Sequence, residues 1–120
     1  MTYLGALDQG TTSTRFIIFD GEGNPVSSHQ QEHRQIFPSP GWVEHDPQEI
    51  WSNSRICIRR ALDKARIDGR ELSGIGLTNQ RETILAWNRI TGEVRHNAIV
   101  WQDVRGAQLL GGIESKKDEA

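Results

Sequence analysis

The chain has 120 residues, of which 25% are charged and 35% hydrophobic, and its formal net charge is −2. This length fits one domain of ordinary size, and the composition allows an apolar core. The basic residues are scattered, which argues against a nucleic-acid-binding surface, and no apolar run is long enough to span a membrane. The single cysteine excludes an internal disulfide, and no signal-peptide pattern is visible, so we expect a cytoplasmic protein.

The first twenty residues predict a β-hairpin. One apolar run, residues 3–7, leads into Asp8, and a second apolar run covers residues 16–19. A glycine and four consecutive hydroxyl residues lie between the two runs, which is typical of two strands joined by a tight polar turn.

The residues of this turn suit an anion. Gly10 has no Cβ, so backbone amides can approach a phosphate closely, and the hydroxyls of residues 11–14 add donors. Arg15 offers a fixed positive fork, and Asp8 can hold the magnesium that accompanies phosphate. On these residues alone, a nucleotide-phosphate clamp and an ordinary polar hairpin turn are equally good interpretations.

The next segments predict an edge strand and a well-capped helix. After a turn cluster at residues 20–25, weak alternation over residues 26–36 indicates a third strand at a sheet edge. The helix is predicted over residues 47–66, with Asp46 as N-cap, a proline at the first helical position and Glu49 as the capping-box partner. Cys57 falls on its apolar face, which indicates a buried structural thiol.

Short strands and a weaker helix follow. Residues 72–78 read as a buried strand, residues 83–87 and 98–101 as two further strands, and the chain from Gln102 onward as a helix weakened by Gly111 and Gly112. Residues 114–120 are charged and are expected to fray. The order of elements predicts an α/β domain with a mixed sheet.

A second group of chemically capable residues follows the strand 72–78. Arg81 and Glu82 stand where ligands bind in open α/β sheets, and together they offer a donor and an acceptor to a small polyol. Their alternative is a solvated loop with two unrelated charges. Trp101 is either a core residue or an apolar wall beside a polyol, while Trp42 is expected to pack and His45 to be a loop histidine.

Four segments resemble the glycerol kinases of the FGGY carbohydrate kinase family. They are residues 7–15 (LDQGTTSTR), 41–47 (GWVEHDP), 78–83 (TNQRET) and 97–103 (NAIVWQD). The first segment is shared with other sugar kinases and more loosely with actin-like ATPases, whereas the second and third are more specific to glycerol kinases. The resemblance covers about the first 105 residues. It implies a ribonuclease-H-like α/β lobe of the actin/hexokinase type, with ATP bound between two such lobes.

The resemblance also implies roles for individual residues and an overall reaction. The implied phosphate contacts are Thr11, Thr12, Ser13 and Arg15, and the implied carboxylate near Mg²⁺ is Asp8. Arg81 and Glu82 would bind the glycerol hydroxyls, and Trp101 would form the aromatic wall of the pocket. The implied reaction transfers the ATP γ-phosphoryl group to a terminal hydroxyl of glycerol, which yields glycerol 3-phosphate.

The chain departs from this family in length and in its catalytic residue. Family members are several times longer, and their catalytic aspartate lies in a downstream Gly-Asp-Gln motif that this sequence lacks. We therefore expect no catalytic base in this chain and no turnover by its 120 residues alone. The expected organisation is an incomplete lobe over residues 1–110 and a polar tail over residues 111–120.

Three alternatives to a glycerol kinase are open. One is another FGGY kinase acting on a different sugar or polyol, and a second is a non-catalytic remnant that serves as a binding or pairing module. The third is an actin-like or chaperone-type ATPase, which is supported only by the loop in residues 7–15. Because one long helix cannot cover both faces of such a sheet, we also expect the chain to self-associate.

Overall fold

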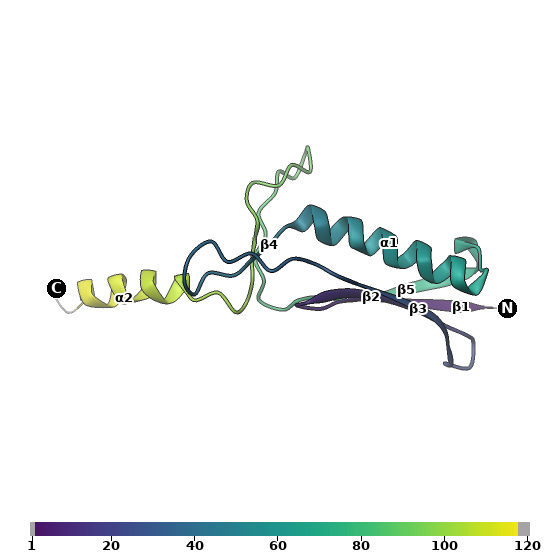
Figure 1. The fold of residues 1–120 in the computed structure, drawn as a ribbon. Helices are drawn as coiled ribbons and strands as arrows, with labels where there is room; N and C mark the ends of the chain where they lie inside the picture. The colour runs from purple at the N-terminus through teal and green to yellow at the C-terminus, as the bar shows by residue number, and fades with distance from the viewer. Residues whose placement is uncertain (1, 118–120) are drawn as a thin grey trace.

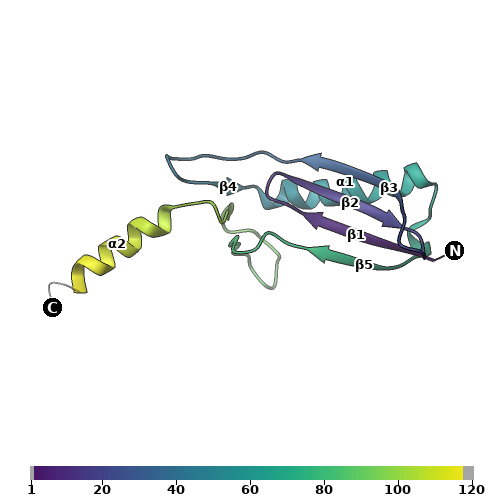
Figure 2. The ribbon, with the colours of Figure 1, turned by 90° about the horizontal axis from the view of Figure 1, so that it is seen from below.

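The computed structural model describes residues 2–117, which form an elongated α/β unit with extents of 67 × 29 × 28 Å (Figure 1). Its main sheet contains β1 (Tyr3–Gln9), β2 (Ser13–Phe19), β3 (Pro25–Glu32) and β5 (Leu72–Thr78), in the order β3-β2-β1-β5. The pairs β1–β2 and β2–β3 are antiparallel, whereas β1 and β5 are parallel (Figure 2). The predicted mixed sheet and the position of the third strand at an edge are confirmed.

The N-terminal hairpin forms as predicted. The backbone N–H of Gly10 donates to the carbonyl of Ser13 (2.9 Å), which closes the turn between β1 and β2. Leu7 lies opposite Phe16 and Asp8 lies opposite Arg15 in the register of the pair. Because side chains alternate along a strand, Asp8 and Arg15 share the face opposite to that of Leu7 and Phe16.

Helix α1 (Pro47–Ala65) matches the predicted helix within one residue. The Asp46 side chain accepts the N–H of Gln48 (2.9 Å), so the predicted N-cap is confirmed. The predicted capping box is wrong, because the Glu49 carboxylate accepts instead from the backbone and guanidinium of Arg34. The helix ends at Ala65, and the C-cap residue Arg66 adopts the left-handed conformation with φ 54°.

The core lies between α1 and one face of the sheet. Phe16, Ile18, Cys57 and Ala61 are fully buried there, so the expected burial of the cysteine is confirmed. Burial raises the pKa of the Cys57 thiol. Figures 1 and 2 show α1 along this face of the sheet, while none of the drawn helices lies over the other face.

The prediction that β5 is a buried strand is wrong. Ile75 and Leu77 are 53% and 70% exposed. The physical reason is the placement of α1, which packs on β2 and β3 but barely reaches β1 and leaves β5 beyond its edge. The two glycines of β5 therefore do not mark close packing from above.

The remaining segments contain less regular structure than predicted. The third strand ends at Glu32, and residues 83–87 form only isolated bridges, Ile84 to Ile99 and Trp87 to Val94. β6 (Ala98–Ile99) is shorter than expected and pairs with an unpredicted strand, β4 (Glu44–His45). A short 3₁₀ turn (Gly69–Glu71) precedes β5.

Helix α2 (Arg105–Lys117) extends away from the sheet, as Figure 1 shows. It continues through Gly111 and Gly112, so the expected interruption does not occur, and residues 114–117 are helical. Glycine in a helix interior weakens it by about 1 kcal/mol without forbidding it. Residues 118–120 of the expected tail lie outside the described residues. Within residues 2–117, no helix is long and apolar enough to cross a membrane.

Candidate active site

An open pocket of about 500 Å³ lies beside the carboxyl ends of β1 and β5. Because these neighbouring strands are parallel, the loops that follow them meet at one edge of the sheet, where ligands bind in open α/β sheets. The lining residues come from the hairpin turn, the loop after β5 and the segment after β6. They are Asp8, Gln9, Gly10, Thr11, Asn79, Gln80, Arg81, Glu82 and Trp101.

The pocket brings together five of the eight residues predicted for the site. They are Asp8, Thr11, Arg81, Glu82 and Trp101. The other three, Thr12, Ser13 and Arg15, lie outside its lining. The Ser13 hydroxyl is buried and accepts from the Gln30 amide (2.7 Å) across the β2–β3 pair, whereas Thr12 and Arg15 are exposed.

The carboxylate of Asp8 is held at the pocket by the strand next to its own. The Thr78 hydroxyl donates to Asp8 Oδ1 (2.7 Å), and the two residues are partners in the β1–β5 register. No cluster of three or more His, Cys, Asp or Glu that could hold a metal occurs in the described part of the chain. A single exposed carboxylate fits Mg²⁺, which binds one or two carboxylates and takes its other ligands from phosphate and water.

Gly10 is not required by the backbone conformation of the turn. Its φ lies outside the left-handed region, and a Cβ built on it would meet the Ser13 carbonyl oxygen at 3.2 Å. A side chain would therefore be crowded but not forbidden by backbone strain. The absence of a side chain at Gly10 therefore matters for the space that it leaves above the turn, and not for the backbone conformation.

The loop after β5 carries backbone strain at the candidate polyol site. Arg81 and Glu82 are both exposed, and Glu82 has φ 67°. A non-glycine residue in the left-handed region is disfavoured, and such strain collects at binding and catalytic sites. The conformation sets where the two side chains leave the loop.

Trp101 connects the two halves of the pocket. Its indole Nε1 donates to the Thr11 hydroxyl (2.9 Å), and its backbone N–H donates to the Thr83 hydroxyl (3.3 Å). The residue is 50% exposed. The core-packing alternative for Trp101 is therefore wrong, and its ring is available as a wall of the pocket.

A buried ion-pair cluster anchors the segment that carries Trp101. The Arg105 guanidinium bonds Asp103 (2.7 Å) and Glu44 (2.8 Å) and lies 3.9 Å from the centre of the Trp42 ring. Hydrogen bonds from Arg105 outweigh burial and hold the pKa of Asp103 at about 2. Burial acts to raise the pKa of Glu44, but bonds from Arg105 and Asn97 lower it overall. Trp42 is a packing residue, as predicted, and its ring packs against the Arg105 guanidinium.

The sequence analysis missed the residues that lie between the two loops. His45 belongs to β4 and is fully buried, so the prediction of a loop histidine is wrong. Its ring contacts the side-chain amides of Gln35 and Gln80. Burial and then the neighbouring His33 lower the pKa of His45 to about 4, against a smaller opposite effect of Glu49. No spacing rule marks these residues, although His45 and Gln80 fall within the family-like segments.

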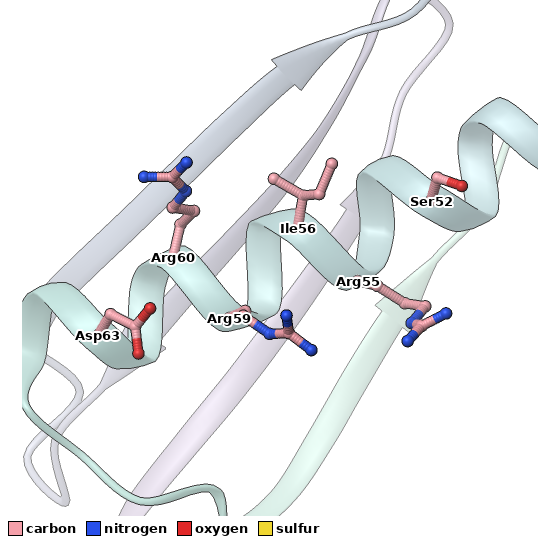
Figure 3. A pocket seen from close by; sticks show the side chains of 6 residues that line it. All are labelled: Ser52, Arg55, Ile56, Arg59, Arg60 and Asp63. Carbon is pink, nitrogen blue, oxygen red and sulfur yellow. The ribbon is translucent and has the colours of Figure 1, made fainter.

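A second hollow, of about 470 Å³, lies on the outer face of α1. Its lining residues are Ser52, Arg55, Ile56, Arg59, Arg60 and Asp63, and Figure 3 shows their side chains spread along and around this one helix. A hollow lined by one helix has no opposing wall. The pocket at Asp8 is lined by three separate segments, so we take it as the candidate active site.

Comparison with known proteins identifies relatives over almost the whole chain. Residues 3–120 match the model of the FGGY family of carbohydrate kinases, N-terminal domain. A curated glycerol kinase from Methylorubrum populi is 60% identical over 110 residues, and one from Haloferax volcanii is 52% identical over 115 residues. These matches cover 92% and 96% of this chain, but the chain spans only 22% of the length of each relative.

Solved structures show the same fold. A Plasmodium falciparum glycerol kinase crystallised with ADP superposes with a TM-score of 0.85 at 37% identity, over 97% of this chain and 23% of that one. A gluconate kinase from Lactobacillus acidophilus superposes with a TM-score of 0.84 at 24% identity, over 96% of this chain and 23% of that one, and supports the fold alone. The predicted α/β lobe with a mixed sheet is confirmed, and the chain belongs to the FGGY family of carbohydrate kinases.

Proposed function

We propose that this chain provides the phosphate loop and part of the polyol site of a glycerol kinase, which phosphorylates glycerol to glycerol 3-phosphate with ATP. The observation that carries the proposal is the shared pocket, in which Asp8 and Thr11 of the hairpin face Arg81 and Glu82 of the next loop. A phosphoryl donor and a small polyol bound there would lie side by side, as direct phosphoryl transfer requires.

Each group in the pocket has a distinct task in this proposal. Thr11 and the amides of the turn contact the phosphates of ATP. Phosphate contacts by Thr12, Ser13 and Arg15, which lie outside the pocket lining, rest on the family resemblance alone. Asp8 holds Mg²⁺, which neutralises phosphate charge when bound. Glu82 accepts from glycerol hydroxyls, and Arg81 donates to them.

The ring of Trp101 covers the carbon edge of glycerol. Its link to Thr11 keeps this wall at a fixed distance from the phosphate loop. The chain has no residue that we assign as the base for the attacking hydroxyl, so in this proposal its part of the work is positioning.

The test uses a chimera in which this chain replaces the matching segment of the Methylorubrum populi glycerol kinase. We expect the chimera to phosphorylate glycerol, and Arg81→Ala or Glu82→Ala to raise its glycerol KM about ten- to a hundredfold, with a much smaller effect on the ATP KM. The loss of one charged partner of a small ligand costs about 1–3 kcal/mol. Arg89→Ala, at an exposed arginine outside the pocket, is the matched control.

A substrate panel separates this proposal from its rivals. Preference of the chimera for a five-carbon sugar over glycerol would assign the chain to another branch of the family. Unchanged glycerol dependence in both variants would show that Arg81 and Glu82 do not bind the substrate.

A further inference from the structure

A buried histidine lies between the two loops of the pocket. His45 Nε2 is 2.7 Å from Oε1 of Gln35, and His45 Nδ1 is 3.2 Å from Nε2 of Gln80. An amide oxygen only accepts and an amide nitrogen only donates. His45 must therefore carry its proton on Nε2 and accept at Nδ1.

Exchanging the oxygen and nitrogen positions of either side-chain amide would break a hydrogen bond, because the other amide atom of Gln35 and of Gln80 is also bonded. Gln35 Nε2 donates to the backbone carbonyl of Thr11 in the phosphate loop (3.0 Å). Gln80 Oε1 accepts from the hydroxyl of Thr83 (3.0 Å). These bonds orient both amides and thereby select the neutral Nε2–H tautomer of the histidine.

The hydrogen bonds close into a ring. From Thr83 the path continues to the backbone N–H of Trp101 (3.3 Å), and the Trp101 indole returns it to the hydroxyl of Thr11 (2.9 Å). The phosphate loop is thus joined to the polyol loop by two routes, one through His45 and one through Trp101. Gln80 directly precedes Arg81 in the chain, so the His45 route ends beside the candidate glycerol contacts.

We propose that His45, as a neutral Nε2–H imidazole, is a positioning residue that fixes the Arg81–Glu82 loop against the phosphate loop. The inference deepens the proposed function and rests on it for the identity of the two ligands. His45 does not line the pocket and acts through its two amide partners.

The surroundings of His45 favour the neutral ring. It is fully buried, and the ring of His33 packs edge-on against it with centroids 4.4 Å apart. Burial and His33 oppose a positive charge on His45, and Glu49 favours it more weakly. A second proton on Nδ1 would also point at the donor group of Gln80, so protonation would break the route to the polyol loop.

Two amide substitutions separate the routes. The Asn amide branches at the same bond count from Cα as His Nδ1, and the Gln amide reaches the position of Nε2. His45→Asn can therefore keep the bond to Gln80 and lose the bond to Gln35, while His45→Gln does the reverse. In the chimera we expect His45→Asn to raise the ATP KM about three- to tenfold and His45→Gln to raise the glycerol KM by a similar factor.

His33→Gln is the matched control. His33 is buried beside His45, and neither ring nitrogen makes a well-aligned hydrogen bond among the described residues, although the nearby Thr11 backbone acts to raise its pKa against the larger lowering by burial. Its replacement disturbs the same packing and leaves both hydrogen bonds of His45 in place. We expect it to lower the thermal midpoint without raising one KM selectively, and an equal rise of both KM values in the two His45 variants would overturn the proposal.

A readout that needs no kinase activity keeps the inference distinct from the proposed function. In the chimera labelled with ¹⁵N-histidine, the signal lost in His45→Gln should report a protonated Nε2 and an unprotonated Nδ1 from pH 8 down to pH 5.5. A chimera that lacks activity but shows this tautomer would refute the proposed function and not the ring. A His45 that titrates near its ordinary value of 6.5, or protonates at Nδ1, would refute the ring.

Discussion

Substitution of Glu82, the strained residue in the loop after β5, can distinguish an effect on stability from an effect on glycerol binding. Glu82 and Arg66 are the non-glycine residues with positive φ among the described residues, at 67° and 54°. Both side chains are exposed. Arg66 ends helix α1, whereas Glu82 lines the candidate pocket. Replacing each by glycine removes the same kind of strain at two positions with different expected functions.

The expected change in stability follows from two opposing effects. The left-handed conformation costs an L-residue roughly 1–2 kcal/mol, which glycine does not incur. Glycine loses more conformational freedom on folding, by roughly 0.5–1 kcal/mol. We therefore expect Glu82→Gly and Arg66→Gly each to stabilise the folded lobe by about 0.5–1 kcal/mol, a similar rise at both positions.

The effect on glycerol should differ between the two variants. Glu82→Gly removes a carboxylate acceptor, at a cost of about 1–3 kcal/mol, so the glycerol KM of the chimera should rise about ten- to a hundredfold. Arg66→Gly should leave it unchanged. Thermal unfolding and steady-state kinetics on the same samples provide both readouts. The reasoning would be refuted if Glu82→Gly lowered stability more than Arg66→Gly, or if it kept the parent glycerol KM.

Four further predictions concern the sheet, the phosphate turn and the chain as a whole. Gly5→Ala places a Cβ 2.4 Å from Phe16 Cζ and should destabilise the lobe by about 1–3 kcal/mol in urea unfolding, whereas Gly76→Ala, with no described atom within 4 Å of its Cβ, should not. Gly10→Val should raise the ATP KM of the chimera and spare the glycerol KM, and an unchanged ATP KM would make residues 8–15 an ordinary hairpin turn. The 120-residue chain alone should release no ADP in a glycerol- and ATP-dependent manner, and enzyme-like release would contradict this. Light scattering should show self-association of the chain at high concentration, which a stable compact monomer would disprove.

The elements that the sequence predicted well are those with local signals. Helix α1 has Asp46 and Pro47 at its start and an apolar stripe that includes Cys57 and Ala61, so its bounds follow from residues a few positions apart. The hairpin of β1 and β2 has its turn residues between two apolar runs. These features need no knowledge of the rest of the chain.

The burial of β5 was not predictable from its own residues. An apolar pattern in Leu72–Thr78 identifies a strand, but its exposure depends on which element lies over it. Here α1 crosses β2 and β3 instead. The strand predicted at residues 83–87 failed for a similar reason, because a strand needs a partner of matching length and β6 has only two residues.

The candidate site also combines features that local sequence predicts with features that depend on distant parts of the chain. Residue type and position after β5 suggested Arg81 and Glu82, but a solvated loop was the better explanation of these two residues until the family resemblance was considered. The structure places both beside Asp8 and Thr11, 70 or more positions earlier in the chain. Their roles as ligand contacts stay predictions.

The hydrogen-bond ring explains why this site has so few local signals. The loop after β5 and the segment after β6 contain little regular structure, so few ladder bonds hold them in place. Side chains spread over the chain, such as Gln35, His45 and Trp101, take over that task. Each bond contributes only about 0.5–1.5 kcal/mol on its own, so the loss of one His45 bond should loosen a loop without releasing it. In the closed ring each bond orients the next one, so the position of each loop depends most on the bonds nearest to it.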